Sequence, residues 1–246
     1  MNLFGIVSWG RAGTCWLSRG LNSHPDIFCV HAGNVQWQKA APGERIDGIR
    51  YMRVIELMAQ SYKVAGDVHG ISRDLIPEIR EALGERFAAA VLIREPLRRF
   101  VSQLAFYEVR GRPQVWDLRY TEQLIARHKI ILPHADTYSD RFVVHAANML
   151  NAIVEESAIG TIYRMEDITT NPHALGMLVT EVTQGSVTVP AGWLETMLKS
   201  PPANTADRSE NFQITAWHVE VLRRVVSPKT WELYAAFGYD QPDVLV

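Results

Sequence analysis

The chain has 246 residues, of which 47% are apolar and 21% charged, a composition that excludes an intrinsically disordered protein. Its 25 Lys and Arg against 27 Asp and Glu give a formal charge of −2, which excludes a chain-wide basic field for binding nucleic acid. The two cysteines, Cys15 and Cys29, are too few for a disulfide framework and lack metal-ligand spacing.

We expect no targeting or membrane-spanning segment. The apolar run at residues 3–7 is too short for a signal peptide and has no basic region before it. No window approaches the roughly eighteen uninterrupted apolar residues of a membrane span. The expectation is a cytoplasmic protein, and because no linker or repeat divides the chain, a single domain over residues 1–246.

The predicted elements alternate between strands and helices. In chain order we expect a strand at 3–7, a helix at 14–21, a strand at 62–68, a helix capped by Asp74 and ended by Gly84, a buried strand at 88–93, a helix starting at Pro96, a helix at 142–154, a strand at 161–163, and helices at 214–226 and 228–237. This alternation predicts an α/β fold of three layers with a mostly parallel central sheet. The polar, aromatic segment 109–140 fits this pattern worst, and we expect a lid or acceptor-facing segment there.

The loop after the first strand has the features of an anion cradle. Gly10 and Gly13 let backbone N–H groups approach an anion, the helix that follows adds its dipole, and Arg11 adds a permanent charge. No Lys-Ser or Lys-Thr follows a glycine here, so the loop lacks the Mg²⁺-binding hydroxyl of nucleotide kinases.

A second cation follows the buried strand at 88–93. Arg94 stands at its carboxyl end, and Ser102 lies eight residues later on the predicted helix. Ligands of open parallel sheets bind at the carboxyl ends of the strands, so Arg94 and the loop at Arg11 are expected to face one crevice. An arginine with a hydroxyl is a suitable clamp for a second phosphate.

These segments resemble the sulfotransferases that use 3′-phosphoadenosine 5′-phosphosulfate. The 5′-phosphosulfate loop of that family reads Lys/Arg-Ser-Gly-Thr-Thr-Trp-Leu, often followed by His-Pro, and its 3′-phosphate motif is an arginine with a serine eight residues on. The matching positions are Arg11, Ala12, Gly13, Thr14, Cys15, Trp16 and Leu17, then His24 and Pro25, then Arg94 and Ser102. Residues 165–168 with Asn171 and Pro172, and the closing residues 237–239, resemble two further family segments.

The resemblance implies a phosphosulfate-binding loop and a role for each matching residue. The backbone of residues Gly10, Arg11, Ala12, Gly13, Thr14 and Cys15 would hold the 5′-phosphosulfate, and Arg11 would neutralise charge on the bridging oxygen. Trp16 would stack on adenine or serve as a core residue. Arg94 and Ser102 would hold the 3′-phosphate, and no metal is expected.

The chain departs from the family at several of these positions. Ala12 and Cys15 replace hydroxyl residues, and Met165 stands where a tyrosine often contacts adenine. The Arg-Lys-Gly element that closes on the 3′-phosphate is missing; Arg208 is a substitute for it or a surface residue. These departures keep open a catalytically inert nucleotide- or glycan-binding module, and a nucleotide kinase or NTPase is the other alternative.

The expected base lies at the end of the strand at 62–68. His69 matches a histidine of the cytosolic branch, and Asp67 falls where carbohydrate-modifying members have a glutamate. The unperturbed pKa of histidine, about 6.5, favours His69 as base, with Asp67 orienting it or binding the acceptor. Residues two apart on a strand share a face, so both would reach the crevice. The acceptor is expected to be the hydroxyl or amine of a small molecule or carbohydrate; His31, His134, His145 and His218 are read as structural or surface residues.

Overall fold

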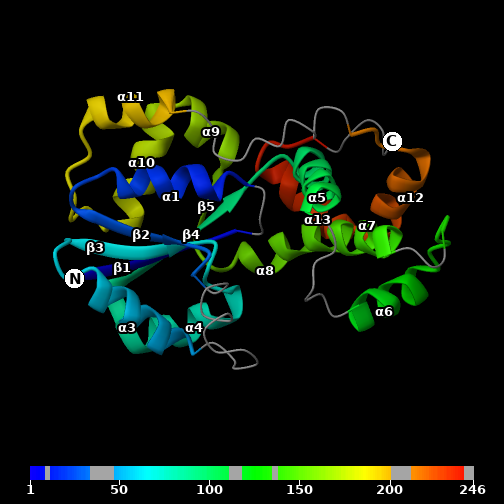
Figure 1. Cartoon of the computed structure of the whole chain (residues 1–246), viewed down its shortest axis with the longest axis horizontal. Coiled ribbons are helices and arrows are strands. Elements are labelled where there is room, and N and C mark those ends of the chain that lie inside the picture. The colour runs from blue at the N-terminus through cyan, green and yellow to red at the C-terminus, as the bar shows by residue number, and fades with distance from the viewer. Residues whose placement is uncertain (9–11, 34–46, 111–117, 135–137, 201–211, 241–246) are drawn as a thin grey trace. The chain divides into compact units, whose positions relative to one another are not determined.

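A computed structural model describes residues 1–8, 12–33, 47–110, 118–134, 138–200 and 212–240 (Figure 1). The chain divides into two compact units, the first of Met1–Arg94 with Glu155–Asn204 and the second of Glu95–Val154 with Thr205–Val246. The sequence gives no sign of this division, and a single domain over residues 1–246 stays a prediction. In the described part of the chain, no helix has both the length and the apolar character needed to cross a membrane.

The first unit contains a five-stranded parallel sheet with the order β2-β3-β1-β4-β5. Its strands are β1 (Asn2–Val7), β2 (Ile27–His31), β3 (Val64–Val68), β4 (Phe87–Ile93) and β5 (Thr161–Arg164). The central strands β1 and β4 are almost entirely buried, as their continuous apolar sequences require. The edge strands β2 and β5 are half-buried and shorter. The predicted α/β fold with a parallel central sheet is confirmed.

Helices cover both faces of this sheet. Figure 1 shows α1 (Thr14–Asn22), α9 (Met165–Thr170), α10 (Pro172–Val182) and α11 (Ala191–Lys199) on one side. On the other side lie α3 (Gly48–Met58) and α4 (Ile76–Leu83), the latter between the 3₁₀ turns η1 (Arg73–Leu75) and η2 (Gly84–Arg86). The core between the sheet and the first group of helices includes Phe4, Ile6, Trp16, Leu17, Leu21, Leu92, Leu175 and Val179.

The second unit is helical. It contains α5 (Pro96–Arg110), α6 (Leu118–His128), α7 (Tyr138–Asn148), η3 (Met149–Ala152), α12 (Ala216–Val225) and α13 (Pro228–Ala236). Helix α7 packs against α5, α6 and α12. Asn151 ties two helix ends together: its Oδ1 accepts from the Ser227 N–H at 2.9 Å, and its Nδ2 donates to the Val225 carbonyl at 2.9 Å.

Several predicted boundaries differ from the structure. The helix expected at 142–154 is interrupted by η3 and continues as α8 (Ile153–Glu156). Asp74 lies inside η1 rather than at a helix cap, which is Ser72 for that turn. Segment 109–140 contains helix α6, whose side chains alternate in exposure at helical spacing. Its role as a lid or acceptor-facing segment stays a prediction.

Candidate functional site

The candidate site lies at the carboxyl edge of the sheet in the first unit. Ser8 follows β1, His31 ends β2, His69 follows β3 and Arg94 follows β4. In the order of the strands, β2 and β3 lie on one side of β1, whereas β4 lies on the other. The chain therefore reverses direction across the sheet when it passes from β3 to β4. Such a change of direction opens a crevice at the carboxyl ends of the strands, where ligands of α/β sheets bind.

Helix α1 begins at this edge, directly after a glycine that the structure requires. Gly13 is the N-cap residue of α1 and has φ +71°, a left-handed conformation that favours glycine. A Cβ on Gly13 would lie 2.0 Å from Cε of Met165, so a side chain there would require the end of the Met165 side chain to move. No acidic residue stands in the first turn of α1, which leaves its N-terminal partial positive charge available for an anion.

The imidazole of His31 is hydrogen-bonded to the side chains of the first two residues of α1. His31 Nε2 lies 3.1 Å from Oγ1 of the buried Thr14 and 3.3 Å from Sγ of Cys15. Burial lowers the pKa of His31, and the nearby His69 and Arg19 lower it further. His31 is therefore a neutral hydrogen-bonding partner of this helix start at neutral pH.

His69 occupies an unusual backbone position immediately after β3. Its φ is +73°, and its N–H donates to the Ile6 carbonyl at 2.9 Å. Its ring Nδ1 is hydrogen-bonded to the Ser8 carbonyl. Because a carbonyl only accepts, Nδ1 must carry the proton, and in the neutral ring Nε2 then holds the lone pair. This is the tautomer that a general base needs.

The two histidines and Ser8 form one cluster. The ring centroids of His31 and His69 are 6.1 Å apart. The Ser8 hydroxyl is buried and has no hydrogen-bond partner among the residues that the structure describes. A buried hydroxyl without a partner is costly, and it is consistent with a polar ligand at this edge.

Asp67 has a different environment from His69. Its side chain is 0% exposed, and its Oδ2 accepts from the Tyr51 hydroxyl at 2.5 Å and from the Gly33 N–H at 3.2 Å. Its Oδ1 accepts from the Gly70 N–H. Burial raises the pKa of Asp67 to about 6, against the opposing effect of these hydrogen bonds. The carboxylate thus anchors the turns that follow β2 and β3.

His69 lies beyond the strand face that Asp67 was expected to share with it. Strand β3 ends at Val68, and the left-handed conformation of His69 interrupts the period-two alternation. The roles predicted for both residues stay predictions.

The other predicted site residues fall into three groups. Gly10, Arg11 and Arg208 lie outside the described residues. Arg94 is half-buried at the end of β4, and Ser102 is buried in α5 of the second unit. Trp16 is 5% exposed and belongs to the core cluster, together with the buried Ala12.

The segments that carried the resemblance also have structural roles. Asn171 Oδ1 accepts from the His173 N–H at 2.9 Å and caps α10, with Pro172 at the first helical position. His24 Nε2 is 3.0 Å from the Thr188 carbonyl, and its Nδ1 accepts from the Asp26 N–H at 3.2 Å. Within the described ranges, no three His, Cys, Asp or Glu side chains gather as a metal site would require.

His31 and Tyr51 are the residues that sequence reasoning missed. Strand β2 was not predicted, because its five residues follow a turn too closely to show a clear period. Without that strand, nothing placed His31 beside His69. Tyr51 lies on α3, and only the fold brings its hydroxyl to Asp67, sixteen residues away.

Comparisons with known proteins show a likeness among solved structures. No family model and no curated protein sequence matches the chain. Among solved structures, a sulfotransferase from Alicyclobacillus acidocaldarius matches with a TM-score of 0.51 and 14% sequence identity, over 98% of this chain and 97% of that chain. At this identity the match concerns the fold, and the chain accordingly has the α/β fold of that sulfotransferase.

Proposed function

We propose that the protein is a sulfotransferase that moves a sulfuryl group from 3′-phosphoadenosine 5′-phosphosulfate to a hydroxyl or amine of a small-molecule or carbohydrate acceptor. The likeness of fold supports this proposal. So does the meeting of a helix start suited to an anion with a histidine suited to act as base.

The donor would be held at both of its charged ends. The N-terminus of α1 after Gly13 offers N–H groups and a favourable dipole for the 5′-phosphosulfate, and Arg11 would add the charge that stabilises the leaving oxygen. Arg94 at the end of β4 would bind the 3′-phosphate, with Ser102 as its proposed partner and Arg208 as a further candidate. The burial of Trp16 in the core weighs against a stacking role for its ring.

In the proposed reaction the acceptor oxygen or nitrogen attacks sulfur in line with the leaving group. A bond from acceptor to sulfur forms, and the bond from sulfur to the phosphate oxygen breaks. The electron pair leaves on that oxygen, which gives adenosine 3′,5′-bisphosphate. The acceptor proton passes to Nε2 of His69, which holds the lone pair of the neutral ring because Nδ1 carries the proton that is donated to the Ser8 carbonyl.

The environment of Asp67 supports His69 rather than Asp67 as the base. Both carboxylate oxygens of Asp67 already accept hydrogen bonds, and its side chain has no exposed surface. Proton removal by Asp67 would require breaking bonds that hold two turns. Its proposed role is to position the backbone that presents His69.

The observation that carries the proposal is the hydrogen bond between His69 Nδ1 and the Ser8 carbonyl. It would hold the proposed base, His69, beside Ser8, the residue that leads into the proposed anion-binding loop. The test is to incubate the protein with the ³⁵S-labelled donor and a panel of phenols, alcohols, amines and sugars, without metal and with a chelator. Labelled product in any acceptor supports the proposal.

The departures at Ala12, Cys15 and Met165 favour one other candidate, an inert binding module of the same fold. Met165 packs against Gly13, where the loop meets α1. Calorimetry with adenosine 3′,5′-bisphosphate separates the candidates. Tight binding without any turnover would indicate the inert module, and binding of ATP that requires Mg²⁺ would indicate a nucleotide kinase.

A further inference from the structure

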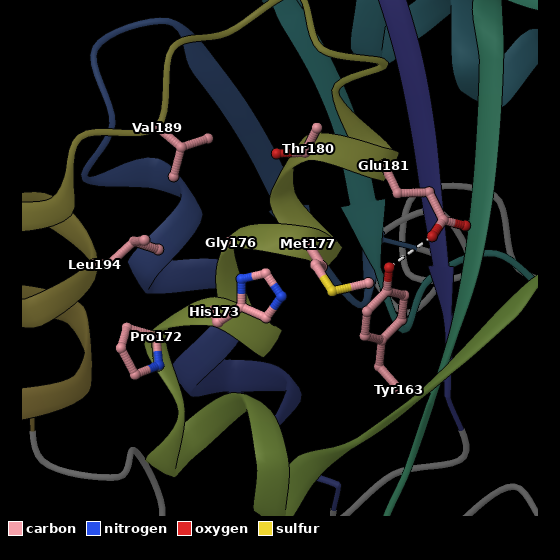
Figure 2. Close-up of a pocket in the computed structure, with 9 residues that line it drawn as sticks. All are labelled: Tyr163, Pro172, His173, Gly176, Met177, Thr180, Glu181, Val189 and Leu194. Carbon is pink, nitrogen blue, oxygen red and sulfur yellow. Dashed lines mark hydrogen bonds between the residues drawn. The ribbon is translucent and has the colours of Figure 1, made fainter.

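A groove with no place in the proposed reaction lies in the first unit. It has a volume of about 540 Å³ and is lined by residues of β5, α10, α11 and the segment before α11: Tyr163, Pro172, His173, Gly176, Met177, Thr180, Glu181, Val189 and Leu194 (Figure 2). This volume is within the range of sites that bind small organic molecules.

The width of the groove depends on Gly176, although the packing around this residue leaves room for a side chain. Gly176 lies in the middle of α10, where glycine is less stable than alanine by about 0.5–1 kcal/mol. A Cβ at Gly176 would meet only Cδ1 of Leu194, at 3.5 Å, which is an ordinary contact. A side chain at position 176 would therefore stabilise the helix, but it would also narrow the groove.

The two ends of the groove differ in chemistry. Figure 2 shows Val189 and Leu194 at one end and the hydrogen bond of Tyr163 with Glu181 at the other. The Tyr163 hydroxyl donates to Glu181 Oε2 at 2.6 Å. Burial raises the pKa of Tyr163, and the Glu181 carboxylate raises it further, so the phenol stays neutral and acts as a donor.

The ionisable side chains of the lining are Tyr163, His173 and Glu181. Among the described residues that line the groove, Glu181 is the one carboxylate, and there is no lysine or arginine. Met177 is 52% exposed, and a flexible thioether adapts to the shape of an apolar ligand.

We propose that this groove binds a small organic ammonium ion with an apolar body. The ammonium group pairs with Glu181 in a charge-assisted hydrogen bond. The apolar body lies over Gly176 and against Leu194 and Val189, where its burial is favourable. An anionic ligand of the same shape is repelled by the carboxylate, and a neutral one gains only the apolar contacts.

The experiment compares three probes of equal chain length, namely hexylamine, 1-hexanol and hexanoate at pH 7. Binding is followed through the methyl NMR signal of Met177 in protein labelled with ¹³C-methyl methionine. We expect saturable shifts of this signal, with hexylamine binding about fivefold more tightly than hexanol, as for a partly exposed ion pair. Hexanoate is expected to bind most weakly. Equal affinity of hexylamine and hexanol, or no shift with any probe, overturns the proposal.

Two variants assign the effect to the groove. Glu181→Gln keeps an acceptor for Tyr163 and removes the charge, so hexylamine loses its advantage while the affinity for hexanol stays within about twofold. Gly176→Leu fills the groove and abolishes binding of both probes. Gly192→Leu is the matched control, because a Cβ at Gly192 meets nothing within 4 Å and Gly192 does not line the groove. An ammonium preference that survives Glu181→Gln contradicts the proposal, even if Gly176→Leu fails to fold.

Discussion

His69 and Asp67 are two residues apart in the chain, yet their surroundings give them different chemistry. The imidazole of His69 has one nitrogen fixed by the Ser8 carbonyl, which determines its tautomer. The carboxylate of Asp67 is enclosed by donors from Tyr51, Gly33 and Gly70. In the proposed reaction His69 accepts a proton, whereas Asp67 holds the local backbone.

We expect His69→Ala to reduce kcat by about 10²–10⁴-fold, the usual effect of losing a general base. The affinity for adenosine 3′,5′-bisphosphate is expected to stay nearly unchanged, because the product carries no acceptor proton. Steady-state kinetics and calorimetry measure the two quantities. His134→Ala is the control, since its side chain is 73% exposed. Full activity of His69→Ala would exclude His69 as the base.

Arg94→Ala tests the proposed 3′-phosphate contact. Loss of a hydrogen bond to a charged group costs about 1.5–3 kcal/mol, or about 10- to 150-fold in affinity for adenosine 3′,5′-bisphosphate. Adenosine 5′-phosphate lacks the 3′ group, so its affinity is expected to change little. Arg98→Ala, an exposed arginine four residues later, is the control. An equal loss for both ligands would show that Arg94 does not read the 3′-phosphate.

The raised pKa of Asp67 predicts how the stability of the fold changes with pH. Its pKa is about 6 in the folded chain, above the value of about 3.9 expected when unfolded. The folded state therefore binds the proton more tightly, and the resulting stabilisation is complete below pH about 4 and lost as pH rises through about 6. Relative to Asp67→Asn, the parent chain is expected to lose about 2–3 kcal/mol of unfolding free energy from pH 4 to pH 7.

Urea unfolding of both proteins across this pH range measures the difference, in which the effects of other groups cancel. Asp74→Asn serves as control, because the Asp74 side chain is 71% exposed. A difference between parent and Asp67→Asn that does not change with pH would contradict the assignment.

At the scale of elements, the sequence predicts best where one pattern dominates. The buried apolar run of β4 and the proline that starts α5 lie within one residue of their predicted positions. The short strand β2 and the interruption of the helix after Asn148 were missed, because neither has a periodic signature of its own. The residues of the candidate site were likewise predictable only where they follow a strand with a clear pattern. The strand ends predicted the loop at Arg11, His69 and Arg94 at one edge, but His31 required knowledge of β2.

The start of α1 gives a prediction about an element. Gly13→Ala places a side chain in a left-handed conformation and against Met165, so we expect it to cost at least about 1 kcal/mol of stability and to weaken binding of the bisphosphate. Chemical denaturation and calorimetry measure both effects. Adding Met165→Ala is expected to recover the steric part of the loss but not the conformational part. Gly192→Ala, whose Cβ has open space, is the control.

At the scale of the whole molecule, the chain shares a fold with a sulfotransferase at 14% identity. A parallel sheet requires only apolar residues of suitable size at its buried positions, so most of the chain can change while the arrangement persists. The division into two compact units could not be predicted, because no change of composition marks residues 94–95 or 154–155.

Ligand binding to the intact protein gives a prediction at this scale. Adenosine 3′,5′-bisphosphate at about 100 times its Kd is expected to stabilise the fold by about 2.7 kcal/mol, which corresponds to a rise in Tm of about 5–10 °C. The rise is expected to be the same with Mg²⁺ and with a chelator. Thermal unfolding measures it, with adenosine as the uncharged control ligand. A shift that appears only with Mg²⁺ would favour the nucleotide kinase.

The unequal surroundings of the two thiols have a practical consequence. Cys29 is buried, and burial raises its pKa, whereas Cys15 is half-buried at the second residue of α1. A mild alkylating reagent should therefore modify Cys15 first, and its rate should fall when an anion occupies the adjoining loop. Mass spectrometry of the intact chain would then serve as an occupancy assay, by which donor analogues can be ranked before any acceptor has been found.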